Sequence, residues 1–184
     1  SIEDADVFIS TYYTVADGPH NALMVYDLIP EQMGYDLSRP EWAKRIWAMQ
    51  RADSFLVNSQ TTADNLSRYY GIGQERVSLV YGGANPDQFY PAPAEEQHRF
   101  RTRYVGGQPY ILLIGSYVPY KFPNVEALIE VAQKSGYATV WPGVNGPRLT
   151  TDELRVAYSA AAAFVTPSLA EGFNIPIIEA MACG

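Results

Sequence analysis

Two glutamates near the end of the sequence have the spacing expected of groups that bind a hydroxyl-rich ligand. Seven residues separate Glu171 from Glu179, and Gly172 directly follows the first glutamate. If a glycine turn opens a helix here, Glu171 lies on the loop and Glu179 about one turn inside the helix. The two carboxylates can then face the same anion, one holding a sugar ring and the other a ribose. The structural alternative is a surface loop residue and a carboxylate that only complements the helix dipole.

The residues between the glutamates predict the start of that helix. Pro176 suits a first helical turn, where its missing N–H costs nothing, and Asn174 is a candidate N-cap. The backbone N–H groups of Phe173, Asn174 and Ile175 would then point outward at the positive end of the helix dipole. Such an end favours a phosphate group.

Lys121 is the best candidate in the sequence for a cation that contacts a diphosphate. It follows the apolar stretch 110–114, and Gly115 and Ser116 stand between them. Loops that follow buried strands are where α/β folds place ligands. The alternative is a solvated loop lysine. The two histidines lie too far apart in the sequence to suggest a metal centre, so we expect no metal site.

The elements that must position these groups alternate between short apolar runs and helical patterns, which is typical of a parallel α/β architecture. Predicted strands cover residues 7–9, 22–26, 55–57, 77–81, 110–114, 138–141 and 164–168. Predicted helices cover residues 40–52, 62–70 and 125–133, and further helices begin near Thr151 and Pro176. Capping boxes at 38–41 and 150–153 support two of these helix starts.

Composition in the middle of the chain indicates a boundary between two lobes. The glycine- and proline-containing stretch 82–86 is followed by Pro91-Ala92-Pro93 and the charged stretch 95–99. We interpret this region as an interdomain hinge. Residues 1–84 and 85–184 are therefore expected to belong to two separate lobes.

Charge and composition exclude several classes of protein. The hydrophobic content of 47% fits a globular enzyme, and no apolar run reaches the length of a membrane span. The net charge of −7 argues against binding to nucleic acid. The single cysteine, Cys183, excludes an intrachain disulfide, and residues 1–6 lack the profile of a signal peptide. We therefore expect a cytoplasmic protein, with peripheral membrane contact possible outside this stretch.

Several segments together resemble glycosyltransferase family 4, the retaining, group 1 glycosyltransferases of the two-lobed GT-B fold. Residues 171–184 match the family text EGFGLPxLEAMACG closely, with Asn174 in place of a glycine. Segment 26–31 resembles the family's His-Asp-x-Ile-Pro-Glu, and 115–121 resembles its loop over the donor diphosphate. Ser116 stands where many relatives have a phosphate-binding arginine, and Tyr26 stands where many have histidine.

The resemblance implies a GT-B-like α/β fold, in which two Rossmann-like lobes with parallel sheets face a cleft. Residues 1–84 would be part of the N-terminal, acceptor-side lobe, and 85–184 part of the C-terminal, nucleotide-sugar-binding lobe. Because relatives are roughly twice this length, we expect both lobes to be incomplete here. The serine in place of arginine removes a bidentate phosphate contact.

The activity implied by the resemblance is transfer of a sugar, with retention of configuration, from a nucleoside-diphosphate sugar to an acceptor hydroxyl. Glu171 and Lys121 are the expected catalytic residues, and no cofactor other than the donor substrate is implied. The expected substrate-binding residues are Gly115, Ser116, Gly172, Phe173, Asn174, Ile175 and Glu179. The expected partners are the donor and a carbohydrate or lipid-linked acceptor, in polysaccharide, lipopolysaccharide or glycoconjugate synthesis.

Two alternatives stay open at the level of sequence. One is a different enzyme on the same fold, such as a sugar-nucleotide epimerase or a glycogen-synthase-like enzyme. The other is a non-catalytic module that binds sugar nucleotides, for which Ser116 and Tyr26 are the motivating residues. Transfer of the sugar to an acceptor would support a transferase, and binding without turnover would support the non-catalytic module. The donor base, the sugar, the acceptor and the oligomeric state are not specified by these residues.

Overall fold

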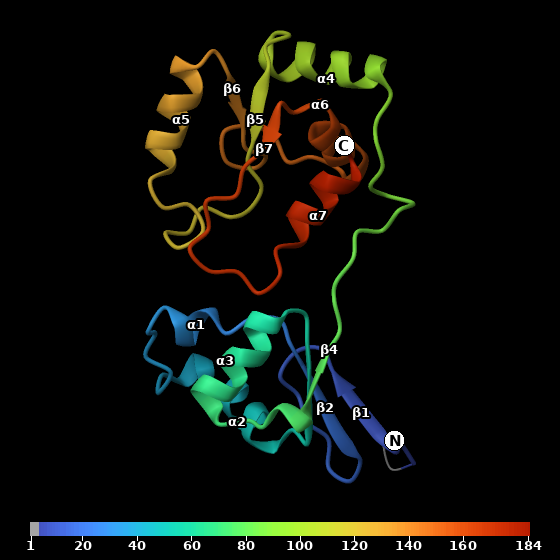
Figure 1. Cartoon of the computed structure of the whole chain (residues 1–184), viewed down its shortest axis with the longest axis vertical. Helices are drawn as coiled ribbons and strands as arrows, with labels where there is room; N and C mark the ends of the chain where they lie inside the picture. The colour runs from blue at the N-terminus through green and yellow to red at the C-terminus, as the bar shows by residue number, and fades with distance from the viewer. Residues whose placement is uncertain (1–3) are drawn as a thin grey trace. The chain divides into compact units, whose positions relative to one another are not determined.

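The computed structural model describes residues 4–184, so residues 1–3 of the stretch considered for a signal peptide lie outside the described residues. The chain divides into two compact units, each with its own parallel sheet. Of the described residues, the first unit contains 4–82 with the short segment 171–173, and the second contains 83–170 and 174–184. The predicted α/β fold with parallel sheets is confirmed (Figure 1).

The sheet of the first unit has four parallel strands in chain order, β1-β2-β3-β4. The strands are β1 (Val7–Ser10), β2 (His20–Val25), β3 (Ser54–Val57) and β4 (Val77–Leu79). Register pairs Leu23 with Phe55 and Val25 with Val57. Side chains alternate across a strand, so these four residues share one face, and all of them are buried.

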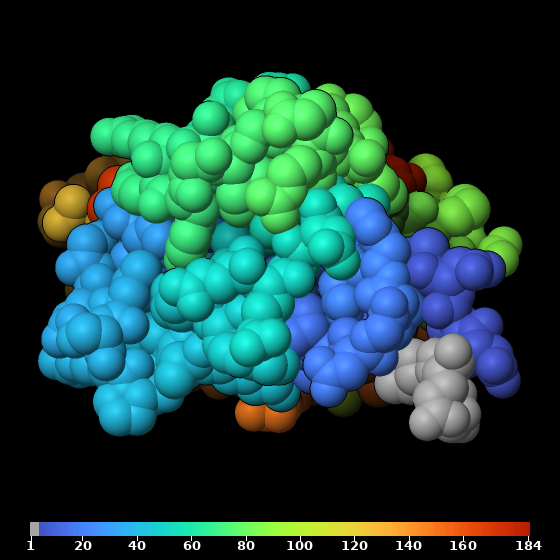
Figure 2. All heavy atoms as spheres, turned by 90° about the horizontal axis from the view of Figure 1, so that it is seen from below, coloured from blue at the N-terminus to red at the C-terminus, as the bar shows by residue number. Residues whose placement is uncertain are grey.

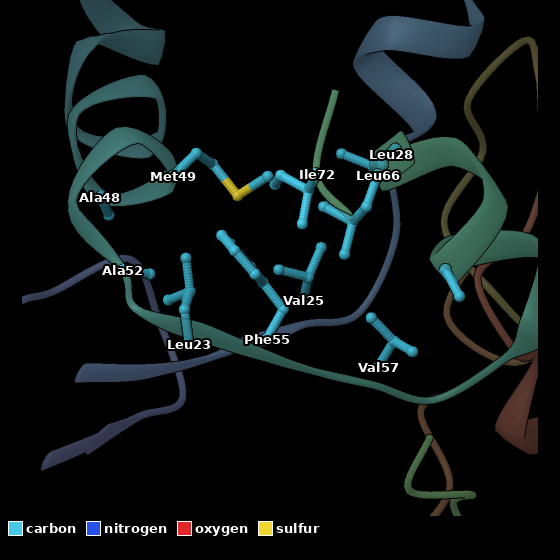
Figure 3. Close-up of a cluster of buried hydrophobic side chains, with 11 residues drawn as sticks. Leu23, Val25, Leu28, Ala48, Met49, Ala52, Phe55, Val57, Leu66 and Ile72 are labelled. Atoms are coloured by element: carbon cyan, nitrogen blue, oxygen red, sulfur yellow. The ribbon is translucent and has the colours of Figure 1, made fainter. Parts of the chain in front are cut away.

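The helices of the first unit complete its core. They are α1 (Ile29–Gln32), α2 (Ala43–Arg51) and α3 (Gln60–Tyr70), with short 3-10 turns at Pro40–Trp42 and Gln74–Arg76. Figure 3 shows the strand side chains pointing toward Met49 of α2 and Leu66 of α3. Ser59 caps α3 by accepting a hydrogen bond from the Thr62 N–H at 3.1 Å, and Gly71 ends it in the left-handed conformation.

The capping box expected at 38–41 is wrong. Ser38 donates its hydroxyl to the Asp36 carboxylate at 2.6 Å, and the turn Pro40–Trp42 precedes α2 without a side-chain cap. The proline sets the φ angle for the first turn, but the serine lies one residue too early to cap it. A local hydrogen bond to an aspartate therefore competes successfully with the cap.

The second unit has a three-stranded parallel sheet in the order β6-β5-β7. Its strands are β5 (Tyr110–Leu112), β6 (Ala138–Val140) and β7 (Ala163–Phe164). Its helices are α4 (Ala94–Val105), α5 (Val125–Lys134), α6 (Thr151–Ala160) and α7 (Ile175–Ala182). The capping box predicted at Thr150 and Glu153 is confirmed, since each side chain bonds the other's backbone N–H.

Two expectations in this unit are wrong. The charged stretch 95–99, assigned to the hinge, lies within α4, where Phe100 faces the core and the charged residues lie mostly at the surface. The strands are also shorter than predicted: β5 ends at Leu112 and β7 at Phe164. The next residues, Leu113 and Val165, are apolar because they pack with Phe122 and Trp141 in a cluster separate from the main core of this unit. Within residues 4–184, no helix is long and apolar enough to cross a membrane.

Candidate functional site

The loop after β5 is held in an unusual backbone conformation. Gly115 has a φ of +130°, and its carbonyl accepts a hydrogen bond from the Trp141 indole N–H at 2.9 Å. A Cβ added to Gly115 would lie 3.3 Å from the Phe122 ring. Both the backbone angle and the close ring therefore require glycine at this position.

A cluster of aromatic rings packs against the same loop. The rings of Phe122 and Trp141 lie 4.3 Å apart between centroids, and Tyr117 meets Trp141 edge-on at 5.7 Å. The Tyr117 hydroxyl donates to Glu126 at 3.0 Å, and this hydrogen bond raises the pKa of the hydroxyl. Ser116 is exposed at the surface of the loop. The loop is thus anchored at one end while its polar residues stay accessible.

Lys121 closes this loop and lies beside the loop after β7. Its backbone N–H donates to the Val118 carbonyl at 3.0 Å, and its carbonyl accepts from the Ser168 hydroxyl at 3.3 Å. One residue earlier, the Tyr120 carbonyl accepts from the Leu169 N–H at 2.8 Å. The structure therefore joins the lysine-bearing loop to the loop that continues into Glu171, Gly172 and Phe173. This joining links two segments that lie about fifty residues apart in the sequence.

Asn174 occupies the N-cap position of α7, but the expected side-chain cap is wrong. Its φ is +64°, and its amide donates to the Thr166 hydroxyl at 3.0 Å instead of binding the helix. The Asn174 carbonyl accepts from the Ile177 N–H at 3.0 Å, which starts the helix through the backbone alone. Pro176 lies in the first turn, as predicted. The asparagine side chain therefore does not cap the first turn of α7.

Glu179 lies about one turn inside α7, where its carboxylate accepts a hydrogen bond from the buried Tyr158 hydroxyl at 3.0 Å. Burial, followed by the negative charge of Glu179 and this hydrogen bond, raises the pKa of Tyr158 well above its usual range. Sequence reasoning missed Tyr158 as a partner. The only available signal was its position on the apolar face of α6, which indicates a core residue and gives no sign of the hydroxyl's acceptor.

A second polar group, also missed, lies in the first unit and centres on Arg45 and Glu31. Arg45 of α2 binds both carboxylate oxygens of Glu31, at 3.1 and 2.9 Å, and donates to the Asp27 carbonyl at 2.9 Å. The Tyr70 hydroxyl donates to Glu31 at 2.5 Å, and Arg45 also hydrogen-bonds the Tyr13 hydroxyl. The side chains of Glu31 and Arg45 are 2% and 7% exposed. This buried network therefore fixes segment 27–31.

The network perturbs the tyrosines around it. Burial raises the pKa of Tyr13 to about 12, although the positive charge of Arg45 opposes the shift. Burial also raises the pKa of Tyr70, and its hydrogen bond to Glu31 adds to this effect. Both hydroxyls therefore stay protonated across the physiological range, Tyr70 as a donor to Glu31 and Tyr13 as an acceptor from Arg45. Among residues 4–184, no group of three or more His, Cys, Asp or Glu side chains is arranged to hold a metal ion.

Comparison with known proteins identifies relatives for both units. The family described as Glycosyltransferase Family 4 matches residues 10–88, and Glycosyl transferases group 1 matches residues 110–184. A D-inositol 3-phosphate glycosyltransferase from Streptomyces bingchenggensis is 30% identical over 79% of this chain and 40% of its own length. The O-antigen chain mannosyltransferase RfbU from Salmonella typhimurium is 22% identical over 94% of this chain and 52% of its own length.

The fold is also found in solved structures. The structure of Anabaena HepE in complex with UDP and glucose matches with a TM-score of 0.66 at 16% identity, covering 90% of this chain and 51% of that one. The chain thus spans about half, or less, of the length of these relatives. The two family matches, which together cover most of the sequence, show that this chain belongs to the family 4, group 1 glycosyltransferases of the GT-B fold.

Proposed function

We propose that this chain is part of a retaining glycosyltransferase that moves a sugar from a nucleoside-diphosphate sugar to an acceptor hydroxyl. The observation that carries the proposal is the joining of the Lys121 loop to the loop after β7 through the Tyr120 and Lys121 carbonyls. Both loops leave the carboxyl ends of neighbouring parallel strands, where α/β folds bind ligands. This arrangement supports a ligand site at that edge of the sheet, to which we assign Lys121 and the residues leading to α7.

The names of the relatives support the choice of substrates. HepE was crystallised with UDP and glucose, and RfbU is described as an O-antigen chain mannosyltransferase. Both descriptions fit a nucleotide-sugar donor and a carbohydrate acceptor. We accordingly propose a role in polysaccharide, lipopolysaccharide or glycoconjugate synthesis. The single, buried Cys183 fits a reducing compartment, so we propose that the reaction occurs in the cytoplasm, with lipid-linked acceptors reached at the inner face of the membrane.

In the proposed reaction, the bond between the sugar's anomeric carbon and the diphosphate breaks while the acceptor oxygen bonds to that carbon on the same face. The departing phosphate takes the acceptor's proton. Lys121 and the N–H groups of Phe173, Asn174 and Ile175 would stabilise charge on the diphosphate, the role that a metal plays in other enzymes. This scheme uses no cofactor beyond the donor.

The remaining residues would hold the donor in place. Gly115 and Ser116 would contact the diphosphate, the serine through a single hydroxyl where relatives use arginine. Glu171 would bind hydroxyls of the transferred sugar, and Gly172 would lie beside it in the same turn. Glu179 would bind the ribose. The hydrogen bond from Tyr158 limits the rotamers of the Glu179 carboxylate and leaves its second oxygen for that contact.

The test is binding of UDP and GDP to the longest available form of the protein, measured by calorimetry. We expect Lys121→Ala to weaken binding of one of them by roughly 10- to 100-fold, because a charge-assisted hydrogen bond of about 1.5–3 kcal/mol is lost. Lys134→Ala is the matched control: this lysine lies on α5 and pairs with Glu130 at the surface. It should leave the affinity unchanged.

Unchanged nucleotide affinity in Lys121→Ala would overturn the assignment of the donor site. The replacement of the usual arginine by Ser116 favours one second candidate, a module that binds the donor without turnover. Release of UDP or GDP from donor sugars in the presence of acceptor distinguishes the two. Binding without release would support the non-catalytic alternative.

A further inference from the structure

A surface pocket of about 340 Å³ lies in the first unit, outside every group assigned above. Five residues of one short segment line it: Tyr35, Asp36, Arg39, Glu41 and Trp42. The segment connects α1 to α2 and lies at the surface, in light blue, in Figure 2. Ligand pockets in proteins begin at about this size. The pocket is therefore large enough to hold one small ring.

Two aromatic side chains form the apolar wall of the pocket. The rings of Tyr35 and Trp42 lie 6.2 Å apart between centroids and are tilted by 54°. Tyr35 is 47% exposed, so a large apolar surface faces water instead of the core. Rigid, amphipathic rings of this kind offer contact area at low cost in conformational entropy. They suit a ligand with one apolar face.

Charged side chains form the rim. Arg39 lies 3.7 Å from the Asp36 carboxylate and 3.9 Å from that of Glu41. These three side chains are 57–65% exposed, and exposed pairs at such distances contribute little to stability. Their donors and acceptors can therefore turn to a ligand's hydroxyl groups without disturbing the fold.

Backbone hydrogen bonds hold the pocket in shape without a ligand. The Tyr35 N–H donates to the Pro30 carbonyl at 2.9 Å, and the Trp42 N–H donates to the Arg39 carbonyl at 3.0 Å. The Asp36 carboxylate accepts from both the backbone N–H and the hydroxyl of Ser38, at 3.1 and 2.6 Å. A preformed site needs less ordering when a ligand binds.

We propose that this pocket binds one monosaccharide unit of a neutral glycan. A sugar ring has an apolar C–H face for the two aromatic rings and a hydroxyl edge for the carboxylates and the guanidinium. Arg39 disfavours an organic cation against the rings, and the two carboxylates disfavour a phosphate or an acidic sugar. We identify this glycan as the acceptor, held by a subsite remote from the reacting hydroxyl, and that identification rests on the proposed function. The binding of a sugar to the pocket does not depend on the proposed function.

The test is ligand-observed NMR on the full chain with three neutral probes, mannobiose, lactose and maltotriose, and with choline chloride as the cationic probe. We expect at least one of the three sugars to bind with a dissociation constant on the order of 1 mM. Tyr35→Ala and Trp42→Ala should each weaken that binding by roughly 5-fold or more, because each removes one aromatic contact face. If Trp42→Ala fails to fold, Tyr35→Ala and Arg39→Ala carry the test, since both side chains are largely exposed.

Trp47→Ala is the matched control, because this tryptophan is 45% exposed, does not line the pocket and has Arg51 of α2 over its ring. It should leave sugar binding unchanged. The proposal is overturned if none of the sugars binds, if Trp47→Ala weakens binding as much as Tyr35→Ala, or if choline binds more tightly than the sugars. Binding of UDP and GDP, measured on the same samples, separates the two proposals. Loss of sugar binding with intact nucleotide binding concerns this pocket alone. Loss of nucleotide binding with intact sugar binding concerns the donor site alone.

Discussion

The Arg45–Glu31 network of the first unit and the Lys121 loop of the second unit are held in place in opposite ways. In the first unit, Glu31 and Arg45 are buried side chains that bind each other through two hydrogen bonds and recruit Tyr13 and Tyr70. In the second unit, the Lys121 loop is held through backbone carbonyls, one glycine and an aromatic cluster. The first arrangement uses charge to fix structure. The second uses neutral contacts to fix the loop.

This difference indicates where each unit tolerates change. A buried ion pair is costly to break because the remaining charge has no water around it. A loop held by backbone contacts tolerates side-chain changes at its exposed positions but not at the glycine or the rings beneath it. The three predictions below test this contrast, beginning with the largest expected effect.

Arg45→Met is expected to destabilise the first unit by about 3–5 kcal/mol, because Glu31 would be left buried without its partner. The measurement is urea unfolding, read together with hydrogen exchange of the amides in β2 and β3. Lys44→Met is the control, since the neighbouring lysine is exposed. A loss below about 1 kcal/mol would mean that Glu31 is neutral or hydrated, and would remove the contrast between the two units.

Gly115→Ala is expected to destabilise the second unit by about 1–3 kcal/mol, because alanine is strained at a φ of +130° and its Cβ would press on Phe122. Gly146→Ala is the matched control, because a Cβ there would meet nothing within 4 Å. Hydrogen exchange in segment 115–121 reports the effect locally. If the two variants lose the same amount of stability, the conformation of the loop does not depend on the glycine at position 115.

The residues themselves explain how much could be predicted from the sequence. Short apolar runs predicted the parallel strands, and the Thr150–Glu153 box predicted the start of α6, because both signals are local. The family text at 171–184 indicated the candidate site, whose residue roles stay a prediction. Its Asn174 cap is wrong, because the asparagine adopts a φ of +64° and turns its amide to Thr166.

The rest depended on contacts across the fold. Arg45 bonds Glu31, fourteen residues away, and Tyr158 bonds Glu179, twenty-one residues away, so no spacing within a single element could indicate either pair. Helix α4 was missed for another reason. Its first turn follows two prolines and carries several charges, a composition that also fits a linker.

The smallest expected effect compares two tyrosines that each donate a hydrogen bond to a glutamate. Tyr70→Phe removes a donor from Glu31, whose side chain is 2% exposed, whereas Tyr158→Phe removes one from Glu179, which is only half-buried. Water can replace the lost donor at Glu179 but not at Glu31. We therefore expect a loss of about 1.5–2 kcal/mol for Tyr70→Phe and about 0.5–1 kcal/mol for Tyr158→Phe. Paired urea titrations at neutral pH measure the difference of about 1 kcal/mol. Equal losses would show that both carboxylates are equally shielded from water, and Glu179 would then be poorly placed to bind a ribose.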